Sequence, residues 1–277
     1  MQGKTVVITG GTSGIGLVAA QALAARGARI VMIARDAPRA RAMIAALAAP
    51  AEGAHAVHVA DLSVLGQMKR AAAQVAEAEP RIDVLVNNAG ALFARRQYTS
   101  DGLEMTFAVN HMGYFVVTAG LMERLKATPG ARVVSTASAA HLSAKLDFED
   151  LQATGEYSGF GAYGRSKLAN ILFTRALARR LVGSGVTANC LHPGFVATRF
   201  GDASGGMVQV LTALAKRLFA ITPEEGAKTI IHLASSPEVE GVSGQYFYRC
   251  KVTTPSIAAQ DDASAERLWA VSEELAG

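Results

Sequence analysis

The chain has 277 residues, of which 50% are hydrophobic and 18% charged, and its net charge is +4. This size and apolar content suffice for a sizeable core, and no apolar run approaches the roughly 18 residues that a membrane-spanning helix needs. Lys and Arg are scattered, so the basic stripe of a nucleic-acid-binding protein is missing. We therefore expect a soluble protein with no integral membrane segment and no nucleic-acid partner.

Cysteine and histidine give no sign of a metal site. The two cysteines, Cys190 and Cys250, lie among apolar residues and match no ligand spacing, which is typical of thiols in a reducing compartment. The six histidines follow no ligand spacing either. The N-terminal residues are already strand-like and show no charged leader, so the expected location is cytoplasmic.

Apolar, β-branched segments alternate with alanine-rich segments along the chain. Strands are predicted at 4–9, 28–34, 55–60, 82–87, 131–137, 186–193 and 244–248. Helices are predicted at 15–26, 37–49, 63–78, 103–127, 161–183 and from Thr222 onward. Near-continuous Val/Ile strands separated by helices are typical of a parallel sheet covered on both faces. Since no linker interrupts the alternation, residues 1–277 are predicted to form a single doubly wound α/β domain.

One insertion, residues 199–221, breaks the alternation. Its large apolar residues fall at helical spacing: Met207, Val210, Leu211, Leu214, Leu218 and Phe219. One interpretation is a helix packed on the core. The other is a lid over an apolar substrate, because crevices in such sheets open at the carboxyl ends of the strands.

A glycine-rich turn follows the first predicted strand. Gly10, Gly14 and Gly16 separate that strand from an alanine-rich helix. Such a turn brings backbone N–H groups and a helix N-terminus to a pyrophosphate, and glycine is needed where φ is positive or a side chain would block the ligand. The turn predicts a dinucleotide-binding site.

Further motifs appear in a characteristic order: Thr9-Gly10-x-x-x-Gly14-x-Gly16, Asp61-Leu62-Ser63, Asn87-Asn88-Ala89-Gly90, Asn110, Ser138, Tyr163-x-x-x-Lys167 and Pro193-Gly194. Because these motifs occur in this order, the chain resembles the short-chain dehydrogenases/reductases over nearly its whole length. Segments 162–198 and 222–247 look most like the retinol-dehydrogenase-type branch. We expect no N-terminal hydrophobic anchor of the kind that membrane-bound members of that branch carry.

The resemblance implies a Rossmann fold, a nicotinamide cofactor and the residues that hold it. By position in the family motifs these are Gly10, Thr12, Ser13, Gly14, Ile15, Gly16, Arg35, Asp61, Leu62, Asn88, Ala89, Gly90, Tyr163, Lys167, Pro193, Gly194, Val196 and Thr198. Relatives are often dimers or tetramers, so a homodimer or homotetramer is expected by analogy.

The end of the second strand bears on the choice of cofactor. Asp36 could accept the ribose hydroxyls of NAD, or it could cap the following helix while Arg35 faces the 2′-phosphate of NADP. Ala34 stands where NAD-preferring relatives carry the acid, and an arginine offers a planar fork for phosphate. We therefore expect NADP rather than NAD, with Arg39 as a second candidate contact. Asp61 is either an adenine contact, by resemblance, or a cap before Ser63.

Tyr163 and Lys167 are four residues apart in a predicted helix and can share one face. A free phenol has a pKa near 10, and a cation one turn away, together with the positive nicotinamide of the oxidised cofactor, favours its ionised form. The pair therefore predicts a general acid/base, Tyr163, whose pKa Lys167 moves toward neutral pH. The resemblance adds that Lys167 binds the nicotinamide ribose.

Two more residues complete the predicted catalytic set. A serine would hydrogen-bond the substrate oxygen, and alignment on the retinol-type branch favours Ser138 over Ser135. Asn110 matches the family asparagine that holds a helix kink and a water in a proton relay. An ordinary helical asparagine is the alternative.

These residues predict an NADP-dependent oxidoreductase acting on an alcohol/carbonyl pair of a hydrophobic small-molecule substrate. The principal alternative is a non-catalytic NADP-sensing regulatory protein on the same fold, since fold alone does not give function. A sugar-nucleotide epimerase or a double-bond reductase is a third hypothesis. Epimerases of this fold usually carry a larger substrate domain than 277 residues allow.

Overall fold

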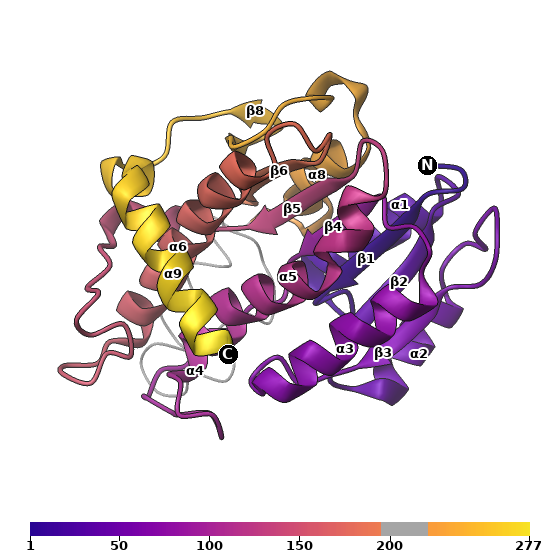
Figure 1. Ribbon diagram of the computed structural model, residues 1–277. Coiled ribbons are helices and arrows are strands. Elements are labelled where there is room, and N and C mark those ends of the chain that lie inside the picture. Colours follow the sequence, from indigo (N-terminus) through magenta and orange to yellow (C-terminus); the bar gives the residue numbers. More distant parts are fainter. Residues whose placement is uncertain (195–220) are drawn as a thin grey trace.

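The computed structural model describes residues 1–194 and 221–277 (Figure 1). Its described strands form one sheet in the order β3-β2-β1-β4-β5-β6-β7-β8. They are β1 (Thr5–Thr9), β2 (Arg29–Ala34), β3 (Ala56–Val59), β4 (Val84–Asn87), β5 (Arg132–Thr136), β6 (Thr187–His192), β7 (Tyr246–Tyr248) and β8 (Lys251–Val252). The pairings from β3 through β7 are parallel, as predicted. The short β8, which was not predicted, is antiparallel to β7.

Helices cover both faces of the sheet (Figure 1). They are α1 (Gly14–Ala24), α2 (Ala37–Ala45), α3 (Leu65–Ala78), α4 (Met105–Phe107), α5 (Gly113–Lys126), α6 (Gly159–Arg180), α8 (Pro223–Ser235) and α9 (Asp262–Ala276). Side chains of a strand alternate between the two faces, so Val7 joins the core beneath α3, α5, α6 and α9. Val6 and Ile8 join the core beneath α1, α2 and α8. This two-sided burial explains the near-continuous apolar strands, and it confirms the predicted doubly wound fold.

The strand order reverses at β1, which lies between β2 on one side and β4 on the other. In open α/β sheets, ligands bind beyond the carboxyl ends of the strands at such a point. The turn at Gly10 leaves the end of β1, Asn88 follows β4, Ser138 follows β5 and Pro193 follows β6. The fold therefore brings these sequence-predicted residues to one edge of the sheet.

Two helical features differ from the sequence prediction. The predicted helix 103–127 is divided into α4, a π-helical turn at Ala108–Met112 and α5. Helix α9 was not predicted; it packs along α6, burying Ala265 and Leu268. The predicted lid at 199–221 lies outside the described residues, apart from Ile221.

Candidate active site

Three glycines shape the turn between β1 and α1. Gly10 and Gly14 have φ values of 68° and 55°, a left-handed conformation that glycine adopts without steric cost. A Cβ on Gly16 would lie 2.3 Å from the carbonyl oxygen of Gly10, and a Cβ on Gly10 would lie 2.7 Å from Cα of Ala89. The turn is therefore packed closely against the end of β4 and leaves no room for a side chain at Gly10 or Gly16.

Asn88 ties three strand ends together around this turn. Its amide N–H donates to Oγ1 of Thr9 at 3.0 Å, and its side-chain Nδ2 donates to the carbonyl of Gly10 at 3.2 Å. Its Oδ1 accepts from Oγ1 of Thr136, on β5, at 3.3 Å. Ala89 N–H also donates to Thr9 Oγ1, at 3.1 Å. These contacts hold the ends of β1, β4 and β5 together, and Thr136 takes part in them although the sequence motifs did not indicate it.

The N-terminus of α1 fits the phosphates of a dinucleotide. Ser13, at the N-cap, makes no capping hydrogen bond with its side chain, and the first turn, which contains Ile15, has no acidic residue. The first amides of a helix have no intrahelical acceptor, and the helix dipole favours an anion there. The carbonyl of Thr12, just before this helix, accepts a hydrogen bond from Nε of Arg39 at 3.2 Å. A cation therefore stands beside the turn.

Asp36 caps α2, which was one of the two roles that the sequence suggested for it. Its Oδ1 accepts from the amide of Arg39 at 3.0 Å, with Pro38 in the first turn of α2. Arg35 is exposed at the end of β2. One carboxylate oxygen of Asp36 is thus occupied by the helix, whereas Arg35 is exposed to solvent directly after β2.

Asp61 also acts as a local cap. Its Oδ1 accepts from the amide of Ser63 at 2.9 Å and from the Ser63 hydroxyl at 2.8 Å. The next residue, Leu62, is buried, and a Cβ on Gly113 would lie 3.4 Å from its Cβ. Asp61 therefore shapes the loop that leads from β3 to α3.

Asn110 lies in the π-helical turn between α4 and α5 and is fully buried. Its Oδ1 accepts from the amide of Ala91 at 2.8 Å, and its Nδ2 donates to the carbonyl of Ala91 at 2.9 Å and to Ser166 Oγ at 2.9 Å. A Cβ on Gly90 would lie 3.4 Å from Asn110 Oδ1 and 3.3 Å from Nζ of Lys167. Asn110 thus joins the helix irregularity, the loop after β4 and α6 beside the lysine.

The two candidate serines have different surroundings. Ser135 is 0% exposed inside β5, and its hydroxyl has no hydrogen-bond partner among the described residues. Ser138 follows β5, where its Oγ accepts from the amide of Ala140 at 3.2 Å and is hydrogen-bonded to the phenol of Tyr163. The structure brings Ser138, not Ser135, to the tyrosine.

Lys167 is 3% exposed and lies one helical turn after Tyr163. Its Nζ donates to the carbonyl of Thr136 at 2.9 Å and lies 5.6 Å from the ring centroids of both Tyr163 and Tyr114. Nδ2 of Asn170 donates to the same carbonyl at 3.3 Å. Tyr114 and Asn170 are absent from the sequence motifs, although Asn170 follows Lys167 at the i, i+3 spacing of one helix face.

Burial is the largest influence on the pKa values of Tyr163 and Lys167. It raises the pKa of the Tyr163 phenol to about 12, against the hydrogen bond with Ser138, which lowers that pKa. It lowers the pKa of Lys167 to about 7. The sequence predicts that Lys167 draws the phenol pKa toward neutrality; in the structure, desolvation is the largest influence on that pKa and keeps the phenol protonated. A protonated phenol is the state that a proton donor requires.

The loop after β6 begins with a fixed turn. Gly194 has a φ of 93°, and its amide donates to Nδ1 of His192 at 3.2 Å. The His192 ring stacks on Tyr248 with centroids 4.1 Å apart. Pro193, between His192 and Gly194 in the sequence, is half-buried. Val196 and Thr198, the predicted nicotinamide contacts, lie outside the described residues.

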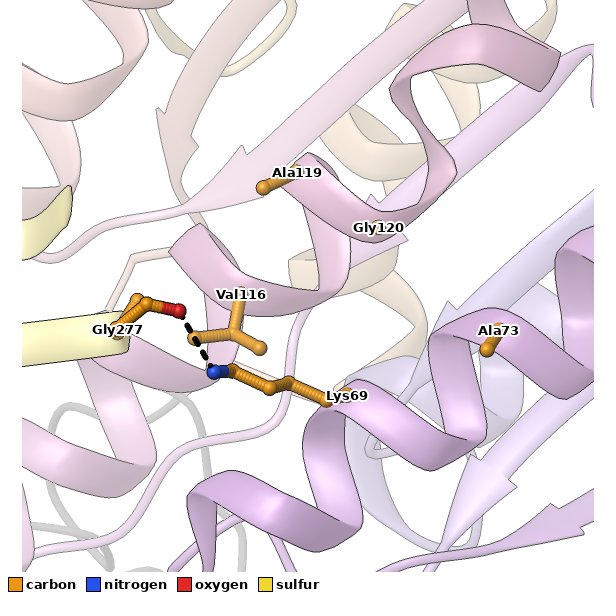
Figure 2. A pocket seen from close by; sticks show the side chains of 7 residues that line it. Lys69, Ala73, Val116, Ala119, Gly120 and Gly277 are labelled. Atoms are coloured by element: carbon orange, nitrogen blue, oxygen red, sulfur yellow. Dashed lines mark hydrogen bonds between the residues drawn. The ribbon is translucent and has the colours of Figure 1, made fainter.

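A separate apolar hollow of about 270 Å³ lies between α3, α5 and the C-terminus (Figure 2). Val116, Ala119 and Gly120 of α5 line it, and Lys69 Nζ donates to the carbonyl of Gly277 at 3.0 Å. None of the predicted catalytic or cofactor residues borders this hollow, so it is distinct from the candidate active site.

Two further observations concern the chain outside segment 195–220. No three His, Cys, Asp or Glu side chains there are grouped so as to hold a metal ion. No helix of those residues is both long and apolar enough to cross a membrane. Cys190 is buried and Cys250 half-buried, both as free thiols.

Comparison with known proteins agrees with this geometry. A sequence model of the family described as short chain dehydrogenase matches residues 4–208. Human retinol dehydrogenase 14 is 42% identical over an alignment that covers 100% of this chain and 87% of that protein. The structure of an uncharacterised protein from Mycobacterium paratuberculosis has a TM-score of 0.80 and 32% identity, covering 99% of this chain and 94% of that chain. The Pseudomonas aeruginosa RhlG/NADP active-site complex has a TM-score of 0.71 and 30% identity, covering 89% of this chain and 94% of that chain.

The fold, the site and the family match establish the class: the chain belongs to the short-chain dehydrogenases/reductases. Its full-length similarity to human retinol dehydrogenases 14 and 13 places it in the retinol-dehydrogenase-like branch of that superfamily. The protein is accordingly an oxidoreductase for an alcohol/carbonyl pair.

Proposed function

We propose that the protein interconverts a hydrophobic aldehyde or ketone and its alcohol with NADP(H), using Tyr163 as the general acid/base. The observation that carries the proposal is the cluster at the end of β5. There the Tyr163 phenol is hydrogen-bonded to the Ser138 hydroxyl, beside the buried ammonium group of Lys167.

NADPH, when bound, supplies the hydride for carbonyl reduction. In that direction, the Ser138 hydroxyl donates a hydrogen bond to the substrate oxygen and polarises the carbonyl. The Tyr163 O–H gives its proton to the same oxygen as the C=O electron pair moves onto it. The resulting tyrosinate is stabilised by Lys167, which the Thr136 carbonyl holds in place. Asn110 connects the π-helical turn to the loop after β4 and to α6 through its hydrogen bonds to Ala91 and Ser166.

The residues around the glycine turn support NADP as the cofactor. One oxygen of Asp36 is occupied by its helix cap, Arg39 supplies positive charge beside the turn, and the exposed Arg35 follows β2 directly. A guanidinium suits a 2′-phosphate, which is a dianionic group that NAD lacks. The apolar spacing of residues 207–219 supports a hydrophobic substrate, and the similarity to retinol dehydrogenases suggests retinal as the first compound to try.

Tyr163→Phe tests the proposal directly. We expect turnover of all-trans-retinal with NADPH to fall by about 10²–10⁴-fold, because the phenyl ring cannot supply a proton. The Kd for NADPH, measured by fluorescence titration, should stay within about twofold of the wild-type value, since the lost proton transfer contributes to turnover and not to cofactor binding. A steroid ketone and an aromatic aldehyde extend the panel if retinal is not accepted.

Tyr157→Phe is the matched control. The Tyr157 hydroxyl donates to the carbonyl of Phe93 at 3.0 Å and to Glu104 Oε1 at 3.1 Å, and neither partner is a predicted site residue. Its loss should lower thermal stability and leave turnover unchanged. A Tyr163→Phe enzyme with wild-type turnover would refute the assigned role. A wild-type protein that binds NADPH but reduces no carbonyl of the panel would instead favour the sensing alternative.

A further inference from the structure

His141 is a fully buried histidine three residues after Ser138. Its Nδ1 lies 2.6 Å from the carbonyl oxygen of Ser138, and its Nε2 lies 3.2 Å from the amide nitrogen of Ser256. A carbonyl can only accept and a backbone amide can only donate, so Nδ1 carries the proton and Nε2 is the acceptor. The two partners therefore fix both the tautomer and the orientation of the ring.

The surrounding contacts hold this ring and the serine loop against the tyrosine helix. The His141 ring packs edge-on against Tyr246, with centroids 5.1 Å apart. The short 3-10 helix η2 (Ala139–Ser143) lies against α6 so closely that a Cβ on Gly164 would be 2.9 Å from the carbonyl of Ala140. Gly164 follows Tyr163 directly. Ser138 therefore begins a short helix that packs against α6 at Ala140 and is linked to the segment at Ser256 through the His141 ring.

His55 offers a comparison, because it also bridges two backbone groups. Its Nδ1 accepts from the amide of Ile30 at 3.0 Å, and its Nε2 lies 2.9 Å from the carbonyl of Ala48. Those partners belong to β2 and the loop before β3, and neither is a predicted site residue. His55 therefore represents what a purely structural histidine contributes in this chain.

We propose that His141 is a positioning residue, which holds the Ser138 hydroxyl against the Tyr163 phenol through its hydrogen bond to the Ser138 carbonyl. The inference rests on the proposed function, in which the Ser138 hydroxyl donates a hydrogen bond to the substrate oxygen. Rotation of the Ser138 backbone would move its hydroxyl away from the position shared by the phenol and a carbonyl oxygen. A misplacement of about 1 Å in such a group can cost about 10²-fold in rate.

Two substitutions separate the two hydrogen bonds of the ring. The amide of an asparagine reaches the position of Nδ1, whereas the amide of a glutamine reaches that of Nε2. His141→Asn keeps the bond to Ser138 and loses that to Ser256; His141→Gln does the reverse. With NADPH and all-trans-retinal, we expect kcat to fall about 10–100-fold for His141→Gln and to stay within about threefold for His141→Asn. The Kd for NADPH should be unchanged in both.

A double-mutant cycle shows whether His141 acts through Ser138. In a Ser138→Ala background the hydroxyl is gone, so His141→Gln should lower kcat no further, because residues acting as one unit are not additive. His55→Gln should lower the melting temperature without changing kcat. If the glutamine variant does not fold, His141→Ala takes its place, since it also lacks the bond to Ser138.

The outcomes distinguish this inference from the proposed function. If Ser138→Ala retains wild-type turnover, the role assigned to Ser138 is wrong and the inference fails with it. If Ser138→Ala removes turnover while His141→Gln keeps kcat, only the inference is overturned. It is equally overturned if the asparagine and glutamine variants lose kcat alike, or if the two effects add in the cycle.

Discussion

Nζ of Lys167 donates a hydrogen bond of 2.9 Å to the main-chain carbonyl of Thr136, the last residue of β5. The same carbonyl accepts from Asn170 Nδ2 at 3.3 Å and from the Tyr114 hydroxyl at 3.4 Å. A carbonyl oxygen has two lone pairs, so three donors compete for it. The ammonium group is therefore positioned by the strand end, but it gains no full opposite charge there, which agrees with the lowered pKa of this lysine.

This burial predicts a pH-dependent stability for the cofactor-free protein. The pKa of Lys167 is about 7 in the folded state against its usual 10.5, so between these values the unfolded chain binds more protons than the folded one. Stability must then rise with pH across that window. We expect wild type to gain free energy of unfolding relative to Lys167→Met when urea denaturation is moved from pH about 6.5 to about 9.5.

Lys145→Met, at an exposed lysine, is the control for the general effect of pH and of a lost charge. The free energy of unfolding of Lys145→Met should differ from that of wild type by the same amount at both pH values. If the free-energy difference between wild type and Lys167→Met is also the same at both pH values, the ammonium is not destabilised by burial in the folded state.

The sequence predicted those features that local pattern determines. The seven predicted strands coincide with β1 to β7 to within about two residues, because β1, β2, β4 and β5 are near-continuous apolar runs and the remaining strands follow the same alternation with helices. The glycine turn was predicted equally well, since positive φ at Gly10 and Gly14 requires the residue that is there. Cofactor choice, the roles of Val196 and Thr198 and the lid stay predictions.

The features that sequence reasoning missed depend on contacts between distant segments. The carbonyl oxygen of Thr136 accepts from Lys167 and Asn170, and no side-chain motif can reveal a main-chain contact of this kind. Helix α9 buries only a narrow stripe of three residues, Ala265, Leu268 and Ser272, so its sequence has a weak apolar periodicity. Three arginines of α6 pair with Asp262 and Glu266 of this helix, a match apparent only once the two helices are side by side.

Cofactor preference should depend on Arg35. Arg35→Ala is expected to weaken NADPH binding about 10–100-fold, the range for losing charged hydrogen bonds to a phosphate. NADH lacks that phosphate, so its Kd should change by less than about threefold. Fluorescence titration of both cofactors measures the two values, and Arg41→Ala, at an exposed arginine of α2, is the control. An equal loss for NADPH and NADH would contradict the assignment of Arg35 to the 2′-phosphate.

Gly16 and Gly66 give a matched test of the glycine turn. Both lie in the first turn of a helix, and within helices alanine is favoured over glycine by up to about 0.5–1 kcal/mol. A Cβ on Gly16 would lie 2.3 Å from Gly10 O and 2.4 Å from Asn88 Nδ2, whereas a Cβ on Gly66 has only ordinary contact with Arg70, at 3.5 Å.

Overpacking at Gly16 costs more than the helix gains, about 1–3 kcal/mol, because the clashing atoms are the main chain of the turn and the amide that ties three strands together. We therefore expect Gly16→Ala to lower the free energy of unfolding in urea by an amount in that range and to weaken NADPH binding. Gly66→Ala should be neutral or stabilising, with NADPH binding unchanged. If Gly16→Ala binds NADPH as wild type does, the close packing of this turn does not serve the cofactor, and the binding site must be sought elsewhere along the strand ends.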